Sequence, residues 1–90
     1  IKMIWEDYGF VVASKYRKLV LLALFSHPKT PSQISVETKI GISHISRALR
    51  ELTKKDIVKC VTPNRIKGKV YSLTKKGVEI AKVIVKNQSE

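Results

Sequence analysis

Residues 42–54, ISHISRALRELTK, constrain the fold of this chain more than any other stretch. At 100° per residue, four apolar side chains fall within one narrow arc at spacing i, i+3, i+4, i+7. They are Ile45, Ala48, Leu49 and Leu52. The opposite side carries a basic, hydrogen-bonding ridge formed by Ser43, Arg47, Arg50 and Lys54. The pattern therefore predicts a helix with one packed side and one side free to bind something.

A short helix is predicted directly before it, over residues 31–38. Thr30 can cap this helix, Pro31 suits its first position, and Gln33 completes a capping box. Ile34 is its main candidate for the core. The chain then turns through residues 39–41, where Gly41 either takes a positive φ or caps the next helix.

Another helix is predicted over residues 15–26, with Ser14 as its N-cap. Its apolar side chains spread almost all round the helix, which indicates a central, buried position. His27 and Pro28 end it.

Two β-type runs, 57–61 and 69–73, follow the amphipathic helix and flank a turn that contains Pro63, Asn64 and Gly68. This arrangement is typical of a β-hairpin. The turn is longer than a tight hairpin needs, and basic side chains gather near its tip. A final helix is predicted to begin after Thr74, which can cap it.

The two ends of the chain carry more apolar surface than one packing face requires. Residues 1–12 show a helical stripe, although Phe10-Val11-Val12 could instead form a short strand. In the final helix, Ile80 and Val83 add a second apolar flank to the main stripe. We expect this surplus to be covered by a second copy of the chain.

The charge distribution points to a polyanionic partner. The formal net charge is +11, and residues 41–76 carry ten basic and two acidic side chains, which is +8 of that total. A surface this basic repels itself, and binding to a polyanion explains why it persists. Nucleic acid is the first candidate and an anionic membrane the second. The plain alternative is that the charge serves solubility alone.

Several kinds of chemistry are not indicated by the sequence. The single cysteine, Cys60, excludes an intramolecular disulfide, and it reads as a small buried thiol, with a redox switch as the alternative. His27 and His44 lie far apart in the chain, so no metal site, cofactor site or catalytic triad is predicted. No run of eighteen apolar residues exists, and we expect a cytoplasmic protein rather than a membrane protein.

Three segments in order resemble the winged helix-turn-helix family. Residues 45–52, 55–58 and 70–77 look like the recognition helix, first wing strand and post-wing segment of small prokaryotic regulators. Arsenical-repressor-like and multiple-antibiotic-resistance-regulator-like proteins, with their archaeal relatives, share this layout. The resemblance covers residues 14–82. It implies a mainly α fold with a small β-hairpin wing, in which a three-helix core is flanked by N- and C-terminal helices.

The resemblance also implies roles for individual residues in binding double-stranded DNA. Residues 42–54 would enter the major groove, and residues 62–69, here called the wing, would contact the backbone or minor groove. Recognition-helix candidates are Ser43, His44, Ser46, Arg47, Arg50 and Lys54. Candidates at the start of the positioning helix, 31–38, are Thr30, Ser32 and Gln33. Wing candidates are Asn64, Arg65, Lys67 and Lys69.

Elementary recognition chemistry separates these candidates further. Arginine can make a bidentate contact with guanine, which favours Arg47, together with His44, for contacts with base edges. His44 could instead merely cover the helix start. Ser43, Ser46, Arg50 and Lys54 suit phosphate or mixed contacts. Arg65 suits a narrow minor groove, while Lys67 and Lys69 suit the backbone. The sequence departs from many relatives at residues 39–42, and it lacks the cysteine or histidine clusters of metal-sensing repressors.

We predict a single domain, residues 1–90, that acts as a sequence-specific transcription regulator without catalytic activity and associates with the nucleoid. The alternatives are a non-specific architectural protein of chromatin and a winged-helix protein-interaction module. RNA binding is less favoured, because no aromatic side chains line the ridge. A homodimer is expected through one or both of residues 1–13 and 74–86, so that two recognition helices meet successive turns of DNA about 34 Å apart. The dimer candidates are Ile4, Trp5, Tyr8, Ile80, Val83 and Ile84. No small-molecule effector is indicated.

Overall fold

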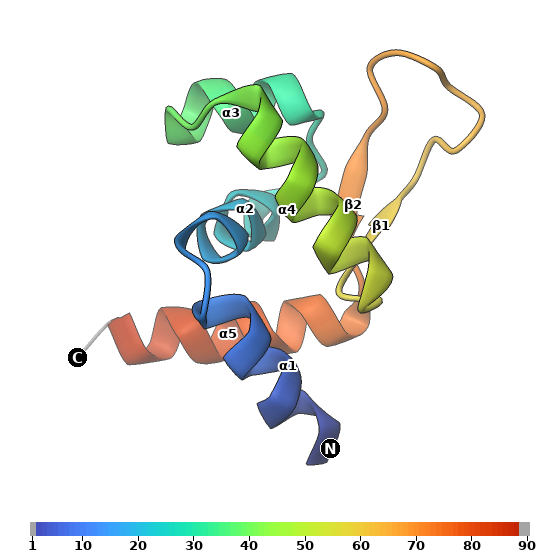
Figure 1. Cartoon of the computed structure of the whole chain (residues 1–90). Coiled ribbons are helices and arrows are strands. Elements are labelled where there is room, and N and C mark those ends of the chain that lie inside the picture. Colours follow the sequence, from blue (N-terminus) through green and yellow to red (C-terminus); the bar gives the residue numbers. More distant parts are fainter. Residues whose placement is uncertain (1, 89–90) are drawn as a thin grey trace.

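A computed structural model describes residues 2–88 of the chain, with side chains described from Trp5 to Asn87. It contains five helices and one two-stranded antiparallel sheet within that range. The elements in order are α1 (Lys2–Val12), α2 (Lys15–Ser26), α3 (Pro31–Thr38), α4 (Ile42–Lys54), β1 (Val58–Cys60), β2 (Tyr71–Leu73) and α5 (Lys75–Gln88). The predicted winged helix-turn-helix fold is confirmed (Figure 1).

Helix α2 forms the centre of the domain. The Ser14 side chain caps it by accepting a hydrogen bond from the Arg17 backbone N–H at 3.3 Å. Val20 and Leu21 are completely buried. The helix contacts α1, α3, α4, α5 and β2. A helix that is apolar nearly all round is stable in water only when neighbours cover it, and these five elements do so.

Helices α3 and α4 have the bounds that the sequence predicts. The capping box of α3 is complete: Gln33 N–H donates to the Thr30 hydroxyl at 3.2 Å, and Thr30 N–H donates to the Gln33 amide oxygen at 2.8 Å. The positive φ of the connecting turn, 61°, lies at Lys39. Gly41 has φ −58° and takes the other predicted role, as the N-cap of α4.

The hairpin strands are shorter than predicted. Runs 57–61 and 69–73 contain only Val58–Cys60 and Tyr71–Leu73 as strands, with Val58 opposite Leu73. One further bond joins Val61 N–H to the Val70 carbonyl at 2.8 Å. The Thr62 hydroxyl then accepts from Val70 N–H at 2.9 Å, which replaces the next backbone pairing and opens the wing.

Helices α1 and α5 pack on the three-helix core and correct part of the dimer prediction. Ile80 and Ile84 are 0% and 3% exposed, so they belong to the core of the single chain and cannot form a surplus face. The reason is that α5 contacts α1, α2 and β2 together, which covers the part of its surface that carries Ile80 and Ile84. Residues 10–12 are helical, so the strand alternative is wrong.

The predicted caps and other dimer candidates can also be located. The Thr74 hydroxyl caps α5 by accepting from Gly77 N–H at 3.1 Å. Trp5 is 62% exposed, and Tyr8 and Val83 are partly exposed. The side chain of Ile4 lies outside the described side chains.

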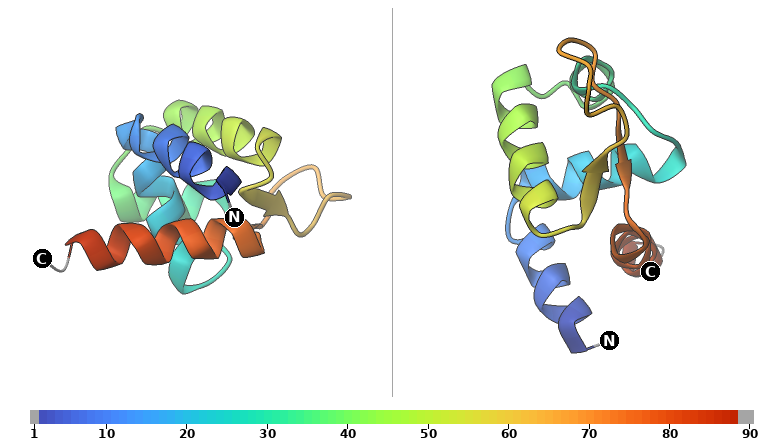
Figure 2. Two further views of the ribbon diagram at one scale, coloured as in Figure 1. Left: turned by 90° about the horizontal axis from the view of Figure 1, so that it is seen from below. Right: turned by 90° about the vertical axis from the view of Figure 1, so that its right-hand side faces the viewer.

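The arrangement divides the molecule into two ends. In Figures 1 and 2, α3, the start of α4 and the wing lie at one end, and α1 and α5 lie at the other. The predicted DNA-binding and dimerisation segments are therefore at opposite ends of the domain.

Among residues 2–88, no helix has the length and apolar character needed to cross a membrane.

Candidate nucleic-acid interface

The basic ridge lies on the exposed side of α4. Its apolar face is buried, with Ile45 and Leu52 completely inaccessible to solvent, which anchors the helix to the core. The ridge residues Ser43, Arg47, Arg50 and Lys54 are all exposed, and so is Ser46 beside them. The Arg47 side chain is 74% exposed. The buried apolar face thus fixes α4 to the core, and the basic side chains of the opposite face are exposed to solvent.

Two of the three candidate DNA-binding side chains at the start of α3 are already hydrogen-bonded within the helix cap. The Thr30 and Gln33 side chains are engaged in the capping box, and Ser32 is exposed. A phosphate contact at this helix start would use the backbone N–H groups and Ser32 more readily than the two capping side chains.

The wing projects beyond the hairpin and carries exposed Asn64, Arg65 and Lys67, with Lys69 half-buried (Figure 1). Arg65 is tied back to the loop, since its Nη1 donates to the Gly68 carbonyl at 3.1 Å. Gly68 has φ 66°, a conformation that favours glycine. Ile66, at the tip, is 93% exposed. The wing therefore presents an apolar tip among basic side chains.

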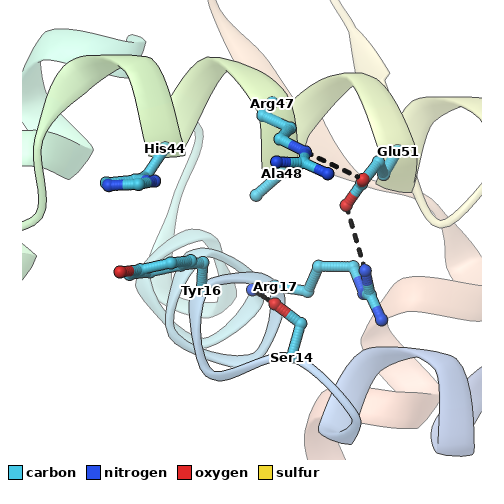
Figure 3. Close-up of a pocket in the computed structure, with 7 residues that line it drawn as sticks. All are labelled: Ser14, Tyr16, Arg17, His44, Arg47, Ala48 and Glu51. Carbon is cyan, nitrogen blue, oxygen red and sulfur yellow. Dashed lines mark hydrogen bonds and ion pairs between the residues drawn. The ribbon is translucent and has the colours of Figure 1, made fainter.

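A cleft of about 270 Å³ lies between the start of α2 and the flank of α4 (Figure 3). The residues that line it are Ser14, Tyr16, Arg17, His44, Arg47, Ala48 and Glu51. The His44 ring stacks on the Tyr16 ring, with centroids 4.4 Å apart and planes 13° from parallel. His44 is thus turned toward α2, beside the ridge, which fits its alternative role of covering the helix start.

Two ion pairs meet at Glu51, one across the cleft from Arg17 of α2 and one along α4 from Arg47. Arg17 Nη1 lies 3.0 Å from one carboxylate oxygen of Glu51, and Arg47 Nε lies 3.4 Å from the other. The Arg17 hydrogen bond lowers the pKa of Glu51 below its ordinary value, and the positive charges of both arginines act in the same direction. Glu51 is therefore ionised at neutral pH.

Sequence reasoning did not identify Tyr16 or Arg17 as part of this region. Both lie just after Ser14, the N-cap of α2. Arg17 is 34 positions away from Glu51, so no local pattern could have revealed the pairing. Arg47 and Glu51, by contrast, are spaced i, i+4 on one helix, which is a recognisable signal.

Potential metal ligands are dispersed in the described part of the chain. No group of three or more histidine, cysteine or acidic side chains comes together among those residues. Cys60 is a free thiol on β1 and is half-buried. The exposed Arg, Lys, Ser and His side chains of this surface can form hydrogen bonds and ion pairs.

Several solved structures share the fold of this chain. Quinone-bound YodB from B. subtilis superposes with a TM-score of 0.76 and 21% identity, covering 94% of this chain and 91% of that one. AdcR from Streptococcus pyogenes gives 0.77 and 16%, covering 84% and 57%. ZitR from Lactococcus lactis in complex with DNA gives 0.73 and 24%, covering 82% and 51%. The chain thus spans about half the length of ZitR, and these likenesses establish the fold alone.

The sequence comparisons identify the family. No curated protein sequence matches the chain. The family model described as HxlR-like helix-turn-helix matches residues 11–89, which include α2, α3, α4, the wing and all of α5. This chain belongs to the HxlR-like helix-turn-helix family.

Proposed function

We propose that this chain is a sequence-specific DNA-binding transcription regulator without catalytic activity. The observation that carries the proposal is the exposed basic ridge on a helix anchored by its opposite face, next to a basic wing. B-DNA's major groove is about 12 Å wide and admits one such helix. The ZitR structure solved with DNA supports the same use of the fold.

The contacts divide between base reading and positioning. Arg47, whose side chain is 74% exposed, contacts base edges in the major groove. Ser43, Ser46, Arg50 and Lys54 position the helix on phosphates, and Ser32 does so at the start of α3. Lys67 and Lys69 follow the backbone, while Ile66 packs in the minor groove. Arg65 reaches the groove only after leaving the Gly68 carbonyl.

Two copies of the chain form the functional unit. Trp5, Tyr8 and Val83 provide the exposed or half-exposed apolar surface at the end opposite the wing. A dimer through that end would leave both ridges free and set two recognition helices on successive turns of one DNA face. Association with the nucleoid follows from this activity.

Competition binding tests the proposal against purely architectural binding. Duplexes selected from random DNA are compared with shuffled duplexes of equal composition as salt is raised. A sequence-specific regulator binds the selected duplex at least about a thousandfold more tightly than the shuffled one as salt is raised. The affinity of purely phosphate-directed binding decays equally for every sequence. An equal affinity for both duplexes at every salt concentration would contradict the proposal.

Substitution of the ridge separates DNA binding from a protein-interaction role. Arg47→Ala with Arg50→Ala should weaken binding to the selected duplex at least about tenfold, the effect of losing one good base contact. Lys82→Ala with Lys86→Ala on α5 is the matched control, because it also removes two exposed positive charges and α5 lies at the opposite end of the domain. If both variants bind as the unmodified chain does, the ridge does not bind DNA.

A further inference from the structure

A chain of contacts links α1 to the DNA-facing side of α4 through Arg17. Its Nε donates to the Phe10 carbonyl at 2.8 Å, and its guanidinium lies 4.0 Å from the centroid of the Phe10 ring. Its Nη1 donates to Glu51 at 3.0 Å. The Arg17 side chain is only 16% exposed. These contacts hold its guanidinium in one orientation between three helices.

Glu51 connects the fixed Arg17 guanidinium to Arg47. One carboxylate oxygen is taken by Arg17, and the other lies 3.4 Å from Arg47 Nε (Figure 3). The ion pair engages the nitrogen nearest the aliphatic stem. The two terminal nitrogens of Arg47 make no hydrogen bond or ion pair with the described residues, and a bidentate contact with guanine needs such a paired set of donors.

An exposed arginine without this ion-pair partner discriminates less between a base edge and a phosphate. A phosphate oxygen attracts a guanidinium as strongly as a base edge does, and every nucleotide carries one. The Glu51 carboxylate also repels phosphates that approach from its flank of the helix. Discrimination between partners often depends on such a repulsive element as well as on the attractive one.

We propose that Glu51, held by Arg17, is a positioning residue that directs Arg47 toward base edges and disfavours its binding to phosphate. This inference rests on the proposed DNA-binding function. Glu51 itself does not touch DNA in this arrangement, and it acts through Arg47. The consequence is an acidic residue within the basic region that lowers total affinity and raises specificity.

The test measures affinity for a selected duplex and for its shuffled counterpart at one salt concentration. Glu51→Gln keeps the size of the side chain and its ability to accept from Arg17, and it removes the charge. We expect binding to shuffled DNA to strengthen and the ratio of the two affinities to fall about tenfold, as when one base contact is weakened. A role in folding alone would leave that ratio unchanged.

Glu79→Gln is the matched control, because it raises the net charge equally from an exposed position on α5. It should strengthen both affinities by the same small factor. Arg17→Met tests the second link, and it should also lower the ratio, since Glu51 loses its fixed partner. Circular dichroism verifies that each variant is folded at the temperature of the binding measurement.

The outcomes distinguish this inference from the function on which it rests. If the unmodified chain prefers the selected duplex and Glu51→Gln keeps the same ratio, the inference is overturned and the proposed function stands. The inference is also overturned if Glu51→Gln and Glu79→Gln change both affinities alike. An unmodified chain with no sequence preference overturns both.

Discussion

At the scale of single residues, Gly77 shows how closely α5 approaches the hairpin. A Cβ at this position would lie 2.2 Å from the Ile57 carbonyl oxygen, a backbone atom that cannot move aside easily. We expect Gly77→Ala to lower the free energy of unfolding by about 2 kcal/mol, because the overpacked backbone must shift. Urea denaturation followed by circular dichroism measures this difference.

Gly9 provides the control within the same molecule. It lies inside α1, and a Cβ there would have no heavy atom within 4 Å. Gly9→Ala should therefore stabilise the chain by about 0.5–1 kcal/mol through helix propensity alone. Equal effects from the two alanine substitutions would show that the space at Gly77 is not limiting.

At the scale of elements, one ion pair joins the two terminal helices. Asp7 of α1 and Lys76 of α5 lie 3.2 Å apart, with side chains 8% and 29% exposed. The Asp7 oxygen of this pair, Oδ2, is buried, and no other described residue donates a hydrogen bond to it. Removal of one partner from a buried pair leaves a charge uncompensated, which costs more than loss of the whole pair.

Lys76→Met should accordingly destabilise the chain by about 2 kcal/mol, less than for a fully buried pair because solvent reaches the lysine. The double variant with Asp7→Asn should recover part of that loss. Lys75→Met at the exposed neighbouring position should change stability by less than about 0.5 kcal/mol. Thermal unfolding of the four proteins gives these values, and a double variant worse than Lys76→Met would refute the explanation.

At the scale of the whole molecule, the position of Trp5 predicts how two copies associate. Its side chain is 62% exposed on α1, with Tyr8 packed edge-on at 5.9 Å between ring centroids. We expect the chain to sediment as a dimer at micromolar concentration and Trp5→Lys to sediment as a monomer. Aromatic anchors of this kind dominate the energy of interfaces.

A matched substitution verifies that the effect belongs to that end of the molecule. Val36 is 79% exposed on α3, which lies at the opposite end. Val36→Lys should leave the sedimentation coefficient of the dimer unchanged. A monomeric unmodified chain, or a Val36→Lys variant that dissociates as Trp5→Lys does, would refute dimerisation through α1.

Much of the fold could be predicted because its signals are local. Capping chemistry at Thr30 and the periodicity of residues 42–54 act within a few turns of helix, so the bounds of α3 and α4 follow from neighbours in the chain. The same periodicity separates the buried face of α4 from its basic ridge. The segment order that indicates a winged helix is likewise readable residue by residue.

The sequence alone thus determined the elements, their order and the cations that the fold presents, since these depend on local chemistry and on residue type. Only the tertiary structure decided which apolar flanks are covered: Ile80 and Ile84 are buried because α5 meets three elements at once. It also decided that Arg17 reaches Glu51 across 34 positions and that both arginines meet at this one carboxylate. Both depend on distances between segments remote in the chain, which no periodic pattern encodes.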